Sequence, residues 1–148
     1  MGGTEWDRVV PYNVDVSAAL TMARVLTFRE GDYYWVHDGR WGFPERPRPG
    51  SIHELWADPV VRETGTHSVL DIWDVCGPDE ESRIASAAPL TRETAHRLFG
   101  TDRPTRDDYQ RAKGSLWGVV EDRGHGYYVV LYRDGVPDEI SFFEVMGD

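Results

Sequence analysis

Residues 126–145 read GYYVVLYRDGVPDEISFFEV, and this stretch decides the fold class that the sequence predicts. Val, Tyr, Phe and Ile fill both of its halves, which is typical of β-strands. The DGVPD between them is a turn sequence, because Gly and Asp tolerate the backbone angles of tight turns and Pro presets them. A segment of similar character, LWGVVE at 116–121, is joined to it by DRGHG. We therefore expect a meander of three consecutive antiparallel strands, LWGVVE, YYVVLYR and EISFFEV.

Helical patterns dominate the first two thirds of the chain. Residues 13–30 carry apolar side chains at helical spacing, with Asn13 or Asp15 as the candidate cap and Gly31 as the candidate end. Residues 51–59 open with an S-x-x-E capping box and end in Pro, which should stop the helix. Cap and stop signals also predict two short helices, in LTRETAHRLFG and in DRPTRDDYQRA.

One strand is expected before the meander, at 66–73, THSVLDIW, where side chains would alternate between two faces. Helices followed by strands are typical of the α+β class. We expect a single α+β domain over 1–148, in which the meander and the strand near 66–73 form an antiparallel β-sheet with helices packed on one face. The strand that ends in FFEV contains no Lys or Pro, so an exposed edge there would allow a homodimer.

Three phrases of the sequence resemble a known group of proteins. They are TEWDRVVPY at 4–12, GTHSVLDI at 65–72 and GYYVVLYRDGVPDEISFF at 126–143, and they are similar to small uncharacterised acidic proteins of actinobacteria. The resemblance covers most of the chain. It implies a shared fold and carries no activity with it.

Composition narrows the class of protein. The chain has 148 residues, of which 40% are hydrophobic, a formal net charge of −10 and one cysteine, Cys76. A domain of this size can bury a core without disulfides, and a lone cysteine suits a reducing compartment. The first residues do not have the pattern of a signal peptide, and no run of apolar residues is long enough to span a membrane. The negative net charge disfavours binding to nucleic acids and to anionic membranes. We therefore expect a soluble cytoplasmic protein. Its acidity is compatible with a basic protein partner, and the alternative is that the charge serves only solubility.

No motif in the sequence fixes a reaction. The histidines lack metal-ligand spacing and there is no Gly-rich nucleotide-binding turn, so neither a metal nor a cofactor is expected. His67, Asp71 and His125 are the polar side chains that an active site would use. In a strand at 66–73, however, His67 and Asp71 would lie roughly 13 Å apart, which is too far for a hydrogen bond.

Residues 32–43, DYYWVHDGRWGF, concentrate aromatic side chains around a turn sequence. Asp-Gly favours a hairpin, so we expect YYWV and RWGF to pair across HDG. Alternation would then place Tyr33 and Trp35 on a buried face and Tyr34 on the opposite one. Because Tyr, Trp and Arg dominate binding hot spots, this segment is also the candidate contact surface. The candidate binding residues are Tyr33, Tyr34, Trp35, Arg40, Trp41 and Phe43.

Two classes of function stay open. The first, which we favour, is an acidic binding module without catalysis of its own, such as an inhibitor or immunity-like protein that contacts a basic partner through the aromatic segment. The alternative is a small enzyme or small-molecule-binding protein, with a Trp- and Tyr-lined pocket and with His67, Asp71 and His125 as polar groups. A deep pocket with convergent polar groups would favour the alternative, and a flat aromatic patch would favour the binding module.

Overall fold

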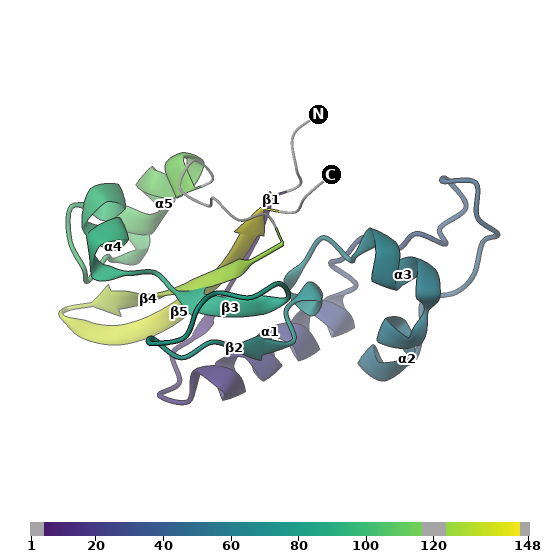
Figure 1. Ribbon diagram of the computed structural model, residues 1–148, viewed down its shortest axis with the longest axis horizontal. Coiled ribbons are helices and arrows are strands. Elements are labelled where there is room, and N and C mark those ends of the chain that lie inside the picture. Colours follow the sequence, from purple (N-terminus) through teal and green to yellow (C-terminus); the bar gives the residue numbers. More distant parts are fainter. Residues whose placement is uncertain (1–4, 117–123, 146–148) are drawn as a thin grey trace.

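The computed structural model describes residues 5–116 and 124–145, which form a five-stranded sheet and surrounding helices (Figure 1). The elements are β1 (Glu5–Pro11), α1 (Val16–Glu30), α2 (Ile52–Ala57), α3 (Pro59–Thr64), the short 3-10 helix η1 (Val69–Asp71), β2 (Asp74–Val75), β3 (Ser86–Pro89), α4 (Arg92–Phe99), α5 (Arg106–Leu116), β4 (Gly126–Arg133) and β5 (Val136–Val145). No helix in the described part of the chain is long and apolar enough to cross a membrane.

The sheet has the order β1-β5-β4-β3-β2 and is mixed. Strands β4 and β5 form an antiparallel hairpin, and Asp134 and Gly135 turn it with positive φ angles of 52° and 78°. This is the two-residue Asp-Gly turn that matches the twist of a hairpin. Strand β1 is antiparallel to β5, whereas β2 and β3 run parallel to their neighbours. The α+β class and the adjacency of the two C-terminal strands are therefore confirmed.

The first predicted strand of the meander, LWGVVE, is not among the strands that the structure describes. Leu116 is the last residue of α5, and the rest of LWGVVE lies outside the described residues. The neighbour of β4 on that side is β3. Strand β5 lies between β1 and β4, so the expectation that it offers an exposed edge for a homodimer is wrong.

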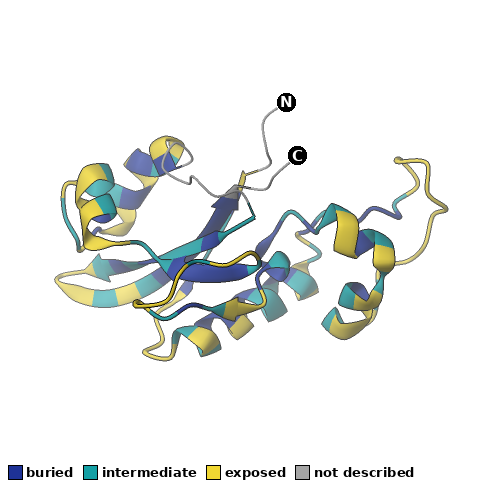
Figure 2. Ribbon diagram, in the orientation of Figure 1, coloured by how far each residue is buried: buried dark blue, intermediate teal, exposed yellow. Residues whose placement is uncertain are grey.

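Helices cover both faces of the sheet, not one (Figures 1 and 2). The cause is the composition of β5, whose alternate side chains are apolar on both sides. Ile140 and Phe142 join the core beneath α1, and Phe143 joins a second core with Tyr109 and Leu116 of α5. A strand with two apolar faces requires cover on both, because either face left in water would lose the free energy of burial.

Local capping chemistry sets the helix ends. Asp15 accepts hydrogen bonds from the first turn of α1, and Gly31 ends that helix in the left-handed conformation, both as predicted. Ser51 caps α2 as predicted. Pro59 does not simply end α2, however, since it is the first residue of α3, which Asp58 caps. Pro is favourable there because its missing N–H has no partner in the first turn of a helix.

The predicted strand at 66–73 is wrong, because side chains in this segment bind their own backbone. Ser68 caps η1 by accepting from the N–H of Leu70, and the Asp71 carboxylate accepts from the backbone N–H groups of Thr66 and His67. Such local bonds compete with strand pairing. The chain reaches the sheet only at Asp74.

A buried hydrogen-bond network joins α5 to the sheet. The hydroxyl of Tyr109 donates to Asp7 Oδ2 at 2.9 Å and accepts from Ser141 Oγ at 2.7 Å. Lys113 Nζ lies 3.1 Å from the same Asp7 oxygen. The Tyr109 ring is fully buried, and burial raises the pKa of its hydroxyl. The network therefore attaches α5 to β1 through Tyr109 and Lys113 and to β5 through Tyr109.

We expect Tyr109→Phe to lower the free energy of unfolding by about 1–3 kcal/mol, because Ser141 would keep a buried hydroxyl without its partner. Urea unfolding followed by tryptophan fluorescence measures the change. Tyr12→Phe, at an exposed tyrosine, is the matched control and should change stability by less than about 0.5 kcal/mol. Equal stabilities for the two variants would contradict a structural role of the network.

Candidate functional site

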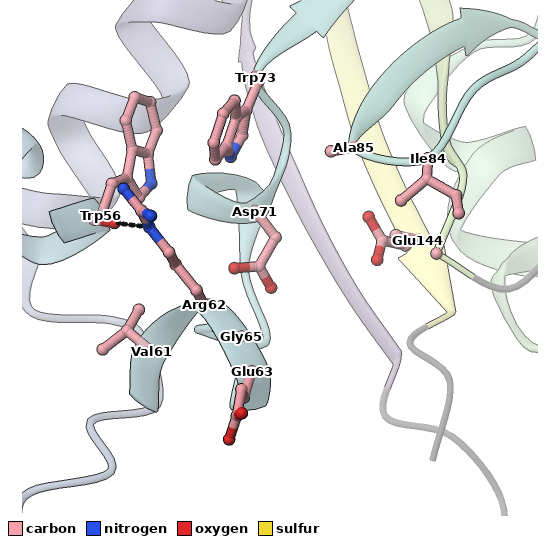
Figure 3. A pocket seen from close by; sticks show the side chains of 11 residues that line it. Trp56, Val61, Arg62, Glu63, Gly65, Asp71, Trp73, Ile84, Ala85 and Glu144 are labelled. Carbon is pink, nitrogen blue, oxygen red and sulfur yellow. Dashed lines mark hydrogen bonds between the residues drawn. The ribbon is translucent and has the colours of Figure 1, made fainter. Parts of the chain in front are cut away.

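A cavity of about 510 Å³ opens between α2, α3, η1 and the end of β5 (Figure 3). Its size falls in the range of pockets that hold small organic molecules. The side chains that give it chemical character are Trp56, Arg62, Asp71, Trp73, Ile84 and Glu144. They come from five separate parts of the chain, and the fold alone brings them together.

Two tryptophans form the aromatic wall of the cavity. The rings of Trp56 and Trp73 stack with centroids 5.4 Å apart and an interplanar angle of 25°. Trp56 is fixed by its indole N–H, which donates to the carbonyl oxygen of Leu70 at 2.9 Å. The Arg24 guanidinium lies 5.6 Å from the Trp56 ring centroid and donates to the carbonyl oxygens of Ile72 and Trp73. The wall is therefore held in place, while Trp73 stays 55% exposed.

Glu144 places a carboxyl group where the strand pattern calls for an apolar side chain. It follows Ile140 and Phe142 on the face of β5 that packs toward α1, and it is only 2% exposed. Figure 3 shows its carboxyl group directed into the cavity. Its Oε2 atom has no hydrogen-bond partner among the described residues. Burial, and secondly the charge of Asp71, raise the pKa of Glu144 from 4.5 to about 8.

Asp71 is the second carboxyl group of the cavity, and its hydrogen bonds differ from those of Glu144. Its oxygens accept from the N–H of Thr66 at 2.7 Å, from the Thr66 hydroxyl at 2.8 Å and from the N–H of His67 at 3.0 Å. Burial raises the pKa of Asp71, although these hydrogen bonds oppose the shift. The site thus pairs a carboxyl group anchored by three hydrogen bonds with a second one whose raised pKa favours the protonated form at neutral pH, in which it can donate a hydrogen bond.

Neither carboxyl group forms an ion pair within the described parts of the chain. The Arg62 guanidinium lines the cavity, but its Nε donates to the carbonyl oxygen of Trp56 at 2.7 Å. Arg24 is also engaged by backbone carbonyls. The nearby basic side chains therefore stabilise the cavity wall and form no direct ion pair with Asp71 or Glu144.

Of the three polar residues predicted for an active site, only Asp71 lines this cavity. His67 binds the carbonyl oxygen of Thr64 through Nε2 at 3.1 Å, and His125 binds Ser82 Oγ through Nδ1 at 2.9 Å. The expected separation of His67 and Asp71 is also wrong. It assumed an extended strand, whereas the turn into η1 brings the Asp71 carboxylate within 3.0 Å of the His67 backbone nitrogen.

The predicted hairpin at 32–43 is wrong as well, since neither YYWV nor RWGF forms a strand. The Trp35 indole N–H donates to the carbonyl oxygen of Arg46, and this bond holds the segment as an irregular loop. Tyr33 and Trp35 are buried, and Tyr34 is partly buried. At the tip, Arg40 is exposed, and Trp41 and Phe43 are 55% and 40% exposed. None of the six candidate binding residues lines the cavity.

A hydrogen-bonded cluster of buried His37, partly buried Asp58 and exposed Arg46 holds this aromatic loop against the α2–α3 junction. His37 Nε2 lies 2.9 Å from Asp58 Oδ2, and Arg46 Nη2 lies 2.6 Å from the same oxygen. Burial opposes ionisation of Asp58, but hydrogen bonds from the N–H groups of Val61 and Val60 and from His37 outweigh it and lower the pKa of this carboxyl. The loop is therefore an ordered platform that presents its tip away from the sheet (Figure 1).

Sequence reasoning missed Trp56, Trp73 and Glu144 as site residues. One signal for Glu144 was present, because ISFFEV places an acid third in the row that begins with Ile140 and Phe142. No comparable signal exists for the tryptophans, since their pairing depends on the path of the chain between α2 and β2.

Comparisons with protein-family models, curated proteins and solved structures find no match for this chain. The resemblance to acidic actinobacterial proteins therefore stays a prediction. Among the residues that the structure describes, no group of three or more His, Cys, Asp or Glu side chains is placed to hold a metal ion.

We expect Glu144→Gln to stabilise the protein, and to do so more strongly at pH 8 than at pH 5. The folded state raises the pKa of Glu144 to about 8 from 4.5, so the wild-type protein loses stability as the pH rises through this interval, while Gln stays neutral. At pH 8, the free energy of unfolding of Glu144→Gln should exceed that of the wild-type protein by about 3 kcal/mol. Urea unfolding at both pH values measures it.

Glu63→Gln is the control for this experiment, because Glu63 lines the same cavity but is exposed. Its effect on stability should be small and nearly equal at both pH values. A Glu144→Gln variant that is less stable than wild type at pH 8 would show that the buried carboxyl is satisfied in the folded state.

Proposed function

We propose that this protein binds a small organic molecule in the cavity between Trp73 and Glu144. The observation that carries the proposal is the buried Glu144 carboxyl group, whose Oε2 has no hydrogen-bond partner in the described structure and which faces an aromatic-walled cavity. A cavity with apolar walls, a few convergent polar groups and a strongly shifted pKa is the usual form of a ligand site. A bound molecule would supply the missing hydrogen bond.

Binding is better supported than covalent catalysis. The described residues that line the cavity include no Ser, Thr, Cys, Lys or His, which are the common nucleophiles and bases of covalent mechanisms. Glu144 could transfer a proton at neutral pH, whereas Asp71 is anchored by hydrogen bonds from the Thr66 and His67 N–H groups and from the Thr66 hydroxyl. The site therefore has the groups to hold and orient a molecule.

A fragment screen by ligand-observed NMR tests this proposal. Trp73→Ala should reduce the affinity of fragments that bind the cavity at least about tenfold, because it removes the exposed half of the aromatic wall. Trp41→Ala is the matched control, since Trp41 is equally exposed but lies on the aromatic loop, and it should leave affinities unchanged. If no fragment depends on Trp73, the cavity is not a ligand site.

The aromatic loop supports a second candidate function, contact with a basic protein partner in an inhibitor- or immunity-like role. Trp41 and Phe43 expose large apolar surface beside Arg40, and the His37–Asp58 pair holds the loop that carries them. Exposed Trp and Arg side chains on an ordered platform suit a binding hot spot. The net charge of −10 would steer a basic protein toward the molecule.

We expect the double variant Trp41→Ala/Phe43→Ala to keep wild-type stability within about 0.5 kcal/mol per site and to lose partners that wild type retains in a pull-down at low salt. Val14→Ala, an exposed apolar residue far from the loop, controls for nonspecific capture. Tyr33→Ala should instead destabilise the fold by about 3–5 kcal/mol, because Tyr33 is buried. Basic proteins retained equally by all variants would exclude the loop as a contact site.

A further inference from the structure

We propose that the ligand of this cavity is an organic cation, an amine, amidine or guanidine whose charged group lies between Glu144 and Asp71 and whose apolar part lies on Trp73. The inference rests on the proposed function and names its ligand class. It starts from an imbalance of charge, since Asp71 and Glu144 line the cavity below its exposed rim, where Glu63 lies, and neither forms an ion pair within residues 5–116 and 124–145.

Neither Arg62 nor Arg24, the basic side chains that contact the cavity wall, forms an ion pair with Asp71 or Glu144 among the described residues. Arg62 Nε donates to the carbonyl oxygen of Trp56, and Arg24 Nη1 donates to the carbonyl oxygens of Ile72 and Trp73. Both therefore support the wall of the cavity. A ligand would therefore supply the positive charge between the two carboxyl groups.

A cation matches the energetics of the site better than other ligands. A buried carboxylate without a partner is expensive, so Glu144 stays protonated in the empty site, and an arriving positive charge would compensate the ionised form. An anion would be repelled by Asp71 and would face Glu144 in a region of low dielectric constant. A neutral molecule could accept a hydrogen bond from protonated Glu144, but it would not compensate a negative charge on Asp71.

The surroundings favour a cation that has a flat apolar part. Cations are attracted to the faces of indole rings, and the exposed Trp73 lines the cavity. The net charge of −10 also raises the local concentration of cations. A planar amidinium could bind two carboxylate oxygens at once, as guanidinium groups do.

Binding of such a ligand should release a proton. Titratable and charged groups face Glu144 from η1, as Asp71, and from α3, as Arg62 and Glu63; its strand neighbours Trp6 and Gly126 carry no charge. A cation beside Glu144 favours its ionised form, so affinity should rise as the pH approaches 8 and then level off. The sign follows because only the ionised carboxyl group pairs with the cation.

The test uses benzamidine, benzamide and benzoate, which have the same ring and carry positive, zero and negative charge. Dissociation constants come from saturation-transfer NMR and calorimetry on the full chain. We expect benzamidine to bind at least about tenfold more tightly than benzamide, and benzoate to bind most weakly. Calorimetry in two buffers at pH 7 should show release of about one proton for each benzamidine bound.

Glu144→Gln should weaken benzamidine about tenfold, abolish the proton release and leave benzamide within about twofold. Glu63→Gln, on the exposed rim, is the matched control and should change benzamidine affinity less than about twofold. Equal binding of benzamide and benzamidine, or an unchanged benzamidine affinity in Glu144→Gln, overturns the cation while the cavity remains a ligand site. If none of the three compounds loses affinity in Trp73→Ala, the ligand site itself fails.

Discussion

The structure depends on one constraint, which is that β5 must be buried on both faces and paired on both edges. It is antiparallel to β1 on one side and to β4 on the other, so its backbone groups are satisfied along most of its length. Ile140 and Phe142 enter the core under α1, while Phe143 enters the core under α5. Helices on opposite sides of the sheet are the consequence, because each row of apolar side chains requires its own cover. The side chains from Ile140 to Glu144 are therefore all buried.

Glu144 is the one acidic side chain in the buried segment from Ile140 to Glu144. Its position in the row of Ile140 and Phe142 forces a carboxyl group into the interior, where burial opposes ionisation. Valine or leucine at this position would add apolar contact and remove the penalty. Proteins keep such unfavourable groups mostly where they serve a function, and stability is then lower than the fold could reach. This is the reason for placing the proposed ligand in the cavity in front of Glu144.

Sequence reasoning succeeded where local chemistry determines structure. Asp134-Gly135 and the flanking β-rich runs predict the β4–β5 hairpin, and Asp15 and Gly31 bound α1, because turns and caps are read from a few adjacent residues. It failed at 66–73. The residues there alternate as they would in a strand, but the Asp71 carboxylate accepts a hydrogen bond from the backbone N–H of Thr66, five residues earlier, and the chain turns instead. The cavity was beyond reach, since Trp56, Trp73 and Glu144 meet only through tertiary contacts.

The local hydrogen bonds that prevent a strand at 66–73 also hold the cavity wall in place. Asp71 anchors the turn from Thr66, Arg24 holds the carbonyl of Trp73, and the Trp56 indole holds Leu70, so three side chains fix the segment that carries two of the site residues. Each of these bonds is complete without a ligand. Glu144 Oε2 alone, among the buried atoms of the described cavity lining, is left unpaired. A ligand would therefore meet a wall already in position, and little binding energy would be lost in ordering it.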